Sequence, residues 1–160
     1  MASDMTLKLA GIEGESKKKG YVGEIDVYDF SFGVTQSASS HDGSGGGSGE
    51  ADVQDLLISK LIDKSSPVLF LYSATGKPIP EAVLTVRKAG GDAIDYLVVT
   101  LTDVIISRVS TGGAAEDDRV KEQVGLNFAK ISIQYKAQKP DGSADAVIQK
   151  TFDIEANAEA

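Results

Sequence analysis

The chain has 160 residues, which fits one domain over residues 1–160, and its 41% hydrophobic and 25% charged residues are typical of a soluble globular protein. It contains no cysteine, which excludes disulfides, thiolate zinc sites and cysteine nucleophiles. Its net charge of −8 argues against binding to nucleic acid, because such binding needs clustered cations that displace counterions from phosphates.

Alternation of apolar and polar residues is the main pattern of the first half of the chain, and it predicts half-buried strands. We expect these strands at Met5–Leu9, at Tyr28–Thr35, near Val53–Ile62 and at Ala82–Arg87. In Tyr28–Thr35, one face is expected to point to the core, and it carries Tyr28, Phe30, Phe32 and Val34. The opposite face carries small or polar side chains, namely Asp29, Ser31, Gly33 and Thr35.

One segment departs from this alternation and predicts a short helix, Pro67–Thr75. Ser66 at the N-cap, Pro67 at the first helical position and Gly76 just past the end are the usual signals of helix boundaries. Five consecutive apolar residues leave this helix without a polar face. A single small domain has difficulty covering such a helix on several sides, so a neighbouring subunit is expected to contact Val68, Leu69, Phe70 and Tyr72.

Two long apolar-rich runs dominate the second half of the chain. Asp95–Ser110 and Val120–Lys136 flank the turn-rich connection Thr111–Asp118, which predicts a long antiparallel hairpin with Phe128 facing the core. A last strand, Val147–Ile154, follows the turn signal Pro140-Asp141-Gly142. The elements together indicate a mainly β protein with one short helix.

Residues 37–50 are expected to form a flexible loop. Its stretch Ser37–Gly49 is rich in glycine and serine and holds no apolar residue larger than Ala38. Loops beyond about 12 residues in a compact domain are usually functional or disordered. Two interpretations stay open, a free tip and a segment that a partner orders. In the second, the candidate assembly residues are Ser40, His41, Asp42, Gly45, Gly46 and Gly47.

The sequence contains no pattern typical of an active site or a cofactor site. His41 is the only histidine and lies in the glycine- and serine-rich loop, whereas a catalytic group must be held rigidly. The glycines of that loop lack the spacing of a phosphate-binding loop. The acidic turn at Asp141 lacks the glycine and glutamate of a calcium loop, because Ala146 and Phe152 occupy those positions. We therefore predict no catalytic residue, no cofactor and no metal site.

Several blocks of residues, spread over the whole chain, carry a resemblance to a known family. They are Asp26-Val27 and Gly33–Ser37 before the loop, Val53–Leu56 with Ser59–Pro67, Leu84–Gly91, Asp95–Leu97 with Val109–Gly113, and Val124–Ile131 with Tyr135 and Gln138. In this order and spacing they resemble the Hcp (haemolysin co-regulated protein) family, the tube proteins of bacterial type VI secretion. The resemblance runs from Met5 to about Asn157.

The resemblance implies an antiparallel, two-sheet β-barrel with the short helix packed alongside. It implies that the protein binds itself, six copies forming a ring and the rings stacking into the inner tube of a contractile apparatus. The other implied partners are the sheath and spike of that apparatus and small effector proteins carried in the ring lumen. One sheet of each subunit would then face the lumen, and we expect Asp29, Ser31 and Thr35 there as cargo contacts. The alternative for this strand is an ordinary face on the outside of the ring.

The N-terminus shows no secretory signal peptide, and no stretch reaches the ~18 apolar residues of a membrane span. We expect synthesis in the cytoplasm, no membrane insertion and, as the resemblance implies, export to the extracellular space through the type VI system. The sequence disfavours two other functional classes. A stand-alone secreted β-sandwich that binds a ligand such as a carbohydrate is disfavoured by the 6% aromatic content. A hydrolase is disfavoured by the missing triad and metal ligands.

Overall fold

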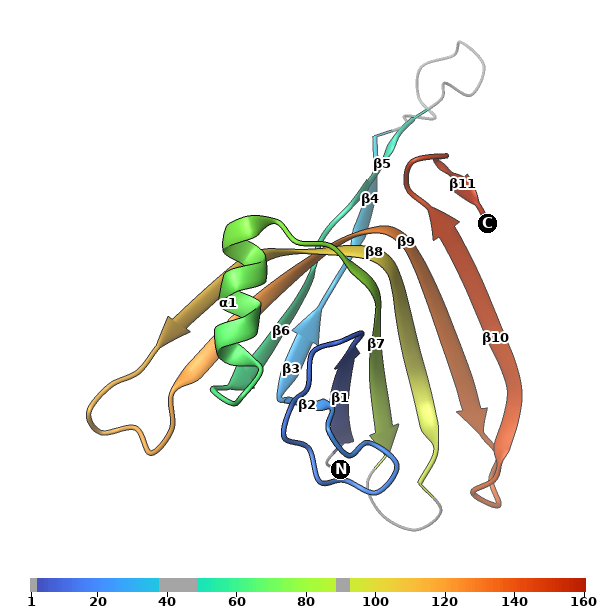
Figure 1. The fold of residues 1–160 in the computed structure, drawn as a ribbon. Coiled ribbons are helices and arrows are strands. Elements are labelled where there is room, and N and C mark those ends of the chain that lie inside the picture. The colour runs from blue at the N-terminus through green and yellow to red at the C-terminus, as the bar shows by residue number, and fades with distance from the viewer. Residues whose placement is uncertain (1–2, 38–48, 89–92) are drawn as a thin grey trace.

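The long hairpin forms the centre of the computed structural model, which describes residues 3–37, 49–88 and 93–160 (Figure 1). Strand β8 (Asp95–Gly112) and strand β9 (Lys121–Gln138) pair antiparallel along almost their full length. The predicted hairpin is therefore confirmed, with strand ends within two residues of those expected. A register shift between Ile106 and Arg108 marks a β-bulge, and a bulge bends the strand that contains it.

The two halves of β9 pair with different strands. Its first half pairs with β6 (Leu56–Leu61), and its second half pairs with β10 (Ala144–Asp153). The remaining strands of the sheet follow on the other side of β8. They are β7 (Ile79–Lys88), β1 (Ser3–Leu9) and β2 (Ile25–Val27), while β11 (Ala158–Glu159) borders β10 at the opposite edge.

A short segment, residues 25–31, links the β2 edge of the sheet back to its centre. Its first part, β2, pairs with β1, and its second part, β3 (Asp29–Ser31), pairs with β6. Only Tyr28 separates the two parts, and its backbone N–H donates to the carbonyl of Ser59 at 2.8 Å. The strand pairing thus runs around the core, and the pairs between named strands of the described residues are antiparallel. The predicted class, mainly β with one short helix, is confirmed.

The expected continuous strand Tyr28–Thr35 is wrong. After β3, the chain leaves the main sheet at Phe32 and Gly33 and forms β4 (Val34–Gln36), which pairs only with β5 (Ala51–Val53) in a projecting ribbon (Figure 1). The backbone N–H of Gln54 donates to the carbonyl of Gly33 at 2.9 Å at the base of this ribbon. Val34 and Tyr28, expected in the core, are exposed, whereas Phe30 and Phe32 are partly buried and stack on each other.

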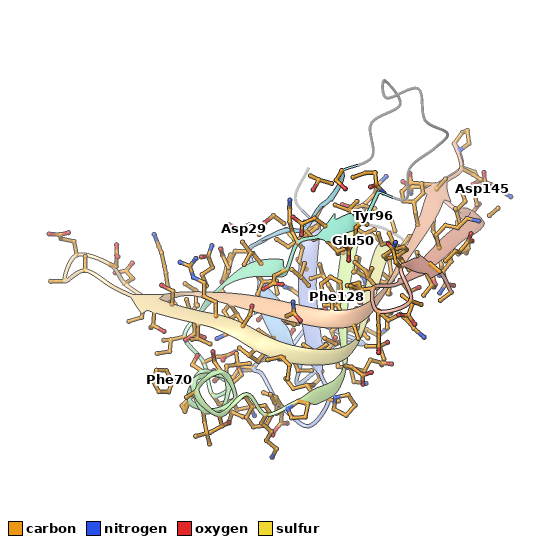
Figure 2. The ribbon with its side chains drawn as sticks, turned by 90° about the horizontal axis from the view of Figure 1, so that it is seen from above. Asp29, Glu50, Phe70, Tyr96, Phe128 and Asp145 are labelled. Carbon is orange, nitrogen blue, oxygen red and sulfur yellow. The ribbon has the colours of Figure 1, made fainter. Side chains whose placement is uncertain are left out.

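A single apolar core fills the space inside the main sheet. Phe128 is 4% exposed within it, as the alternation predicted (Figure 2). The core is a large cluster that draws on most strands and on the helix, and its members of greatest volume include Leu7, Ile25, Leu56, Ile58, Leu69, Ile79, Leu84, Leu101, Ile106 and Leu126. Such continuity between elements makes the core the main stabilising feature of the fold.

Helix α1 (Ser66–Thr75) packs against β8 and starts one residue earlier than expected. Ser65, not Ser66, is its N-cap residue, and the Ser65 side chain makes no capping hydrogen bond. The Ser66 hydroxyl is bonded instead to the buried side chains of Lys60 and Glu122. At the other end, Gly76 adopts φ 67°, a left-handed conformation that glycine takes without strain, and its N–H caps the helix on the Tyr72 carbonyl. Only Ser66 and Leu69 of the helix are buried.

Three further predictions concern the glycine- and serine-rich loop, the turn at Asp141 and membrane spans. The candidate assembly residues Ser40, His41, Asp42, Gly45, Gly46 and Gly47 lie outside the described residues. The turn at Asp141 is present, and its carboxylate accepts hydrogen bonds from the backbone and the hydroxyl of Ser143. Among the described residues, no helix is long and apolar enough to cross a membrane.

Candidate functional site

The register of the sheet builds a polar surface on the side of β3, β6, β9 and β8 that points away from the core. Residues paired directly across antiparallel strands project to the same face. Asp29 pairs with Ser59, Ser59 with Gln123, and Gln123 with Ser110. These four residues therefore form one row across four strands, which we call the polar row.

A second row of paired residues lies beside the polar row on the same face of the sheet. Ser31 pairs with Leu57, and Leu57 with Gly125. A Cβ on Gly125 would lie 2.9 Å from the Ser107 hydroxyl and 3.3 Å from a methyl group of Leu57, so a larger residue does not fit there without movement. Gly125 in turn pairs with Arg108, which is exposed, so the two rows hold mostly uncharged side chains with one carboxylate, Asp29, and one guanidinium, Arg108.

Asp55 fastens one end of this surface. Its carboxylate accepts a hydrogen bond from the Ser107 hydroxyl at 2.6 Å and another from the Asn127 side-chain amide at 2.9 Å. These bonds tie the turn before β6 to β8 and β9. Toward the other end, an open groove of about 600 Å³ is lined by Tyr28, Asp29, Ser59, Lys60, Leu61, Ser110, Gly112, Lys121, Glu122 and Gln123.

The three predicted cargo contacts do not stay together. Asp29 and Ser31 are exposed and lie on the non-core face of β3, as the alternation predicted. Thr35 lies in the separate β4–β5 ribbon, where it pairs with Asp52. Which space the face of Asp29 and Ser31 borders depends on the assembly.

A buried ion pair, missed in the sequence, lies on the other side of the same strands. The Lys60 side chain is 0% exposed, and its Nζ lies 2.6 Å from Glu122 Oε1 and 3.1 Å from Asp63 Oδ1. It also donates to the Ser66 hydroxyl at 2.9 Å, and Ser66 in turn donates to Glu122 at 3.0 Å. Thr111 donates to the second Glu122 oxygen at 3.0 Å.

This ion-pair cluster is structural. The Lys60 ammonium is paired with two carboxylates, and no buried side-chain N or O atom in the described part of the chain lacks a hydrogen-bond partner. It joins β6, β8 and β9 to the first residue of α1. Lys60 occupies a core-facing position in the alternation Leu56, Ile58, Lys60, and that position was the signal that could have revealed it.

A second polar cluster fastens the loop before β2 to the ends of β7 and β8. The Tyr21 hydroxyl donates to the Asp95 carboxylate, which also accepts from Arg87 Nε at 3.0 Å. The Arg87 guanidinium lies 4.3 Å from the centre of the Tyr21 ring. Burial, together with the Asp95 carboxylate, raises the pKa of Tyr21 above its ordinary value, so the phenol stays protonated as a donor. The cluster holds the loop against the sheet.

The predicted subunit-interface residues of the helix differ in exposure. Leu69 is fully buried in the molecule's own core, so its prediction as an interface residue is wrong. Tyr72 is partly buried, and the Lys77 ammonium lies 4.9 Å from the centre of the Tyr72 ring. Val68 and Phe70 are exposed, and Phe70 is 66% exposed on the outer side of α1 (Figure 2). Within residues 3–37, 49–88 and 93–160, no group of three or more histidine or acidic side chains is arranged to hold a metal ion.

Comparisons with known proteins agree with this description. Residues 6–135 match the family model described as "Type VI secretion system effector, Hcp". The chain is 46% identical over 146 residues to Protein hcp1 of Pseudomonas aeruginosa, covering 91% of this chain and 90% of that protein. The crystal structure of Hcp1 from Salmonella typhimurium is similar with a TM-score of 0.83 at 35% identity over 100% of both chains. A type VI secretion effector from Yersinia pestis gives a TM-score of 0.77 at 34% identity, covering 94% of this chain and 99% of that one.

Proposed function

This chain belongs to the Hcp family of type VI secretion proteins, and we propose that it is a structural subunit of the tube through which that system delivers its cargo. In this role six copies form a ring, and rings stack into the tube. The observation that carries the proposal is the similarity to Hcp proteins over nearly the whole chain. Hcp is a structural, secreted family and not a family of enzymes, so the polar surface is interpreted as a wall and not as an active site.

The polar row and its neighbouring row support the interpretation as a wall. A strand face turned to bulk solvent usually carries long charged side chains. Here the row across four strands contains two serines, a glutamine and one aspartate. The two serine side chains are short and let a passenger protein approach the backbone of β6 and β8 closely. We therefore assign this surface, with Asp29 and Ser31, to the lumen of the ring.

The mass of the assembly tests the proposed function. At micromolar concentration, light scattering after size exclusion is expected to give six times the 16.7 kDa of one chain. A closed ring has a fixed mass, because its last interface is formed between the first and last copies. A single species of 16.7 kDa at this concentration would contradict the proposal.

Ser31→Gln tests the lumen assignment. The change adds length on an exposed position of β3, and an exposed substitution changes the free energy of unfolding by no more than about 0.5 kcal/mol. We expect the ring mass to stay unchanged while co-purification of a small effector protein with the ring falls at least about tenfold. Thr35→Gln, on the separate ribbon, is the comparison variant and is expected to retain the effector. Loss of the ring itself in Ser31→Gln would place Ser31 in a subunit interface.

A further inference from the structure

The outer side of α1 is an apolar stripe that no described residue of its own chain covers. Pro67, Phe70, Leu71 and Ala74 follow the spacing i, i+3, i+4, i+7 and share one face of the helix. Phe70 is 66% exposed and Leu71 is 57% exposed. The helix sequence SPVLFLYSAT contains no charged residue. Adjacent large apolar side chains on a charge-free helix face mark an interaction surface.

A second apolar surface lies between the β4–β5 ribbon and the second half of the β9–β10 hairpin. It is a cleft of about 280 Å³, lined by Phe32, Gly33, Val34, Ala51, Val53, Ile131, Ile133 and Phe152, with no charged residue among them. Val34 on one wall is 63% exposed, and Ile133 on the other is 36% exposed. An apolar cavity of roughly 150 Å³ holds one benzene-sized ring, so this cleft has room for a phenyl ring and a neighbouring aliphatic side chain.

The stripe and the cleft of one molecule cannot meet. Helix α1 packs on β8, whereas β10 and β11 lie away from it at one edge of the main sheet (Figure 1). The buried Leu69 side chain anchors the helix to the core. The Ser66 hydroxyl, in the first turn of the helix, forms hydrogen bonds with Lys60 and Glu122. The helix is therefore fixed in place with its stripe turned outward, and the ion-pair cluster sets its position.

We propose that the cleft of one copy receives Phe70 and Leu71 from α1 of the next copy in the ring. This inference rests on the proposed function, and it names the two surfaces that build the ring. One polypeptide supplies both surfaces, and both are apolar and free of charge. Two copies that each carry a net charge of −8 can approach there without bringing their carboxylates together.

The two surfaces differ, so the contact runs head to tail. A heterologous contact leaves a free stripe at one end and a free cleft at the other, and it closes into a ring when the rotation between copies divides a full turn. Each closed ring then buries every stripe and every cleft. That outcome accounts for both exposed apolar surfaces with a single kind of contact.

The test uses one variant for each surface. Phe70→Glu places a carboxylate on the stripe, and Val34→Glu places one on the wall of the cleft. Each variant alone is expected to run as a monomer and to associate at least about 30-fold more weakly than the unmodified chain, the effect of a hot-spot residue. Val22→Glu is the control, because Val22 is 76% exposed and belongs to neither surface. It is expected to retain the ring.

Mixing the two variants separates this contact from other ways of assembling. Phe70→Glu keeps an intact cleft and Val34→Glu keeps an intact stripe, so an equimolar mixture is expected to form a heterodimer of twice the 16.7 kDa chain mass and nothing larger. Circular dichroism checks that each variant is folded. If Phe70→Glu does not fold, Leu71→Glu replaces it, and if Val34→Glu does not fold, Ala51→Glu replaces it.

Three results would overturn the inference. They are single variants that still form rings, single variants that lose only the stacking of intact rings, and a mixture that stays monomeric. A monomeric unmodified chain would instead overturn the proposed function, so the two failures are distinguishable.

Discussion

Glu122→Ala is expected to lower the free energy of unfolding by about 3–5 kcal/mol, the usual cost of removing one partner from a buried ion pair. The Lys60 ammonium, which is fully buried, would keep Asp63 as its only carboxylate. Ser66 and Thr111 would each lose an acceptor. Urea denaturation followed by circular dichroism measures the loss, with all variants at one protein concentration because association adds to apparent stability.

An exposed ion pair of the same chain provides the matched control. Lys150 and Glu159 lie 3.7 Å apart with side chains 79% and 76% exposed, and Glu159→Ala is expected to cost no more than about 1 kcal/mol. The double variant Lys60→Met, Glu122→Leu is expected to lose less than Glu122→Ala, because no charge from this pair is left buried. A loss below about 1 kcal/mol for Glu122→Ala would contradict the structural role of the cluster.

Phe128→Ala is expected to cost about 3–5 kcal/mol, because it empties an aromatic site in the core. Phe128 is 4% exposed and pairs across the hairpin with the fully buried Val104. Tyr28→Ala, at an aromatic residue that is 57% exposed, is the comparison and is expected to stay within about 1 kcal/mol. The same denaturation measurement applies. If Phe128→Ala cost less than about 1 kcal/mol, the register of the hairpin would be off by one residue.

The sequence predicted the elements whose pattern is long. Asp95–Gly112 and Lys121–Gln138 each contain enough alternating residues to define both the strand and its inward face. The strands β2 and β11, with three and two residues, are too short to show a period and were missed. The break at Phe32 and Gly33 was also missed, because alternation continues through it. What divides the strand there is a change of partner, from β6 to β5.

The candidate site shows the same limit at the level of side chains. Alternation placed Asp29 and Ser31 correctly on the face away from the core, since that needs only the local period. It also grouped Thr35 with them, although the chain changes sheets between Ser31 and Thr35. The sequence does not distinguish Leu69 from its apolar neighbours in the helix, because only the packing of the helix shows that Leu69 is the one that is buried in the core. Lys60 pairs with Glu122, which lies 62 positions further along the sequence, and a local sequence pattern cannot predict such a distant pair.

Negative-stain electron microscopy of the purified chain tests the proposed tube subunit most directly. We expect rings with sixfold symmetry and a central opening in end views, and stacks of such rings in side views at high protein concentration. A field of separate particles of the size of one 16.7 kDa chain, without rings, would contradict it.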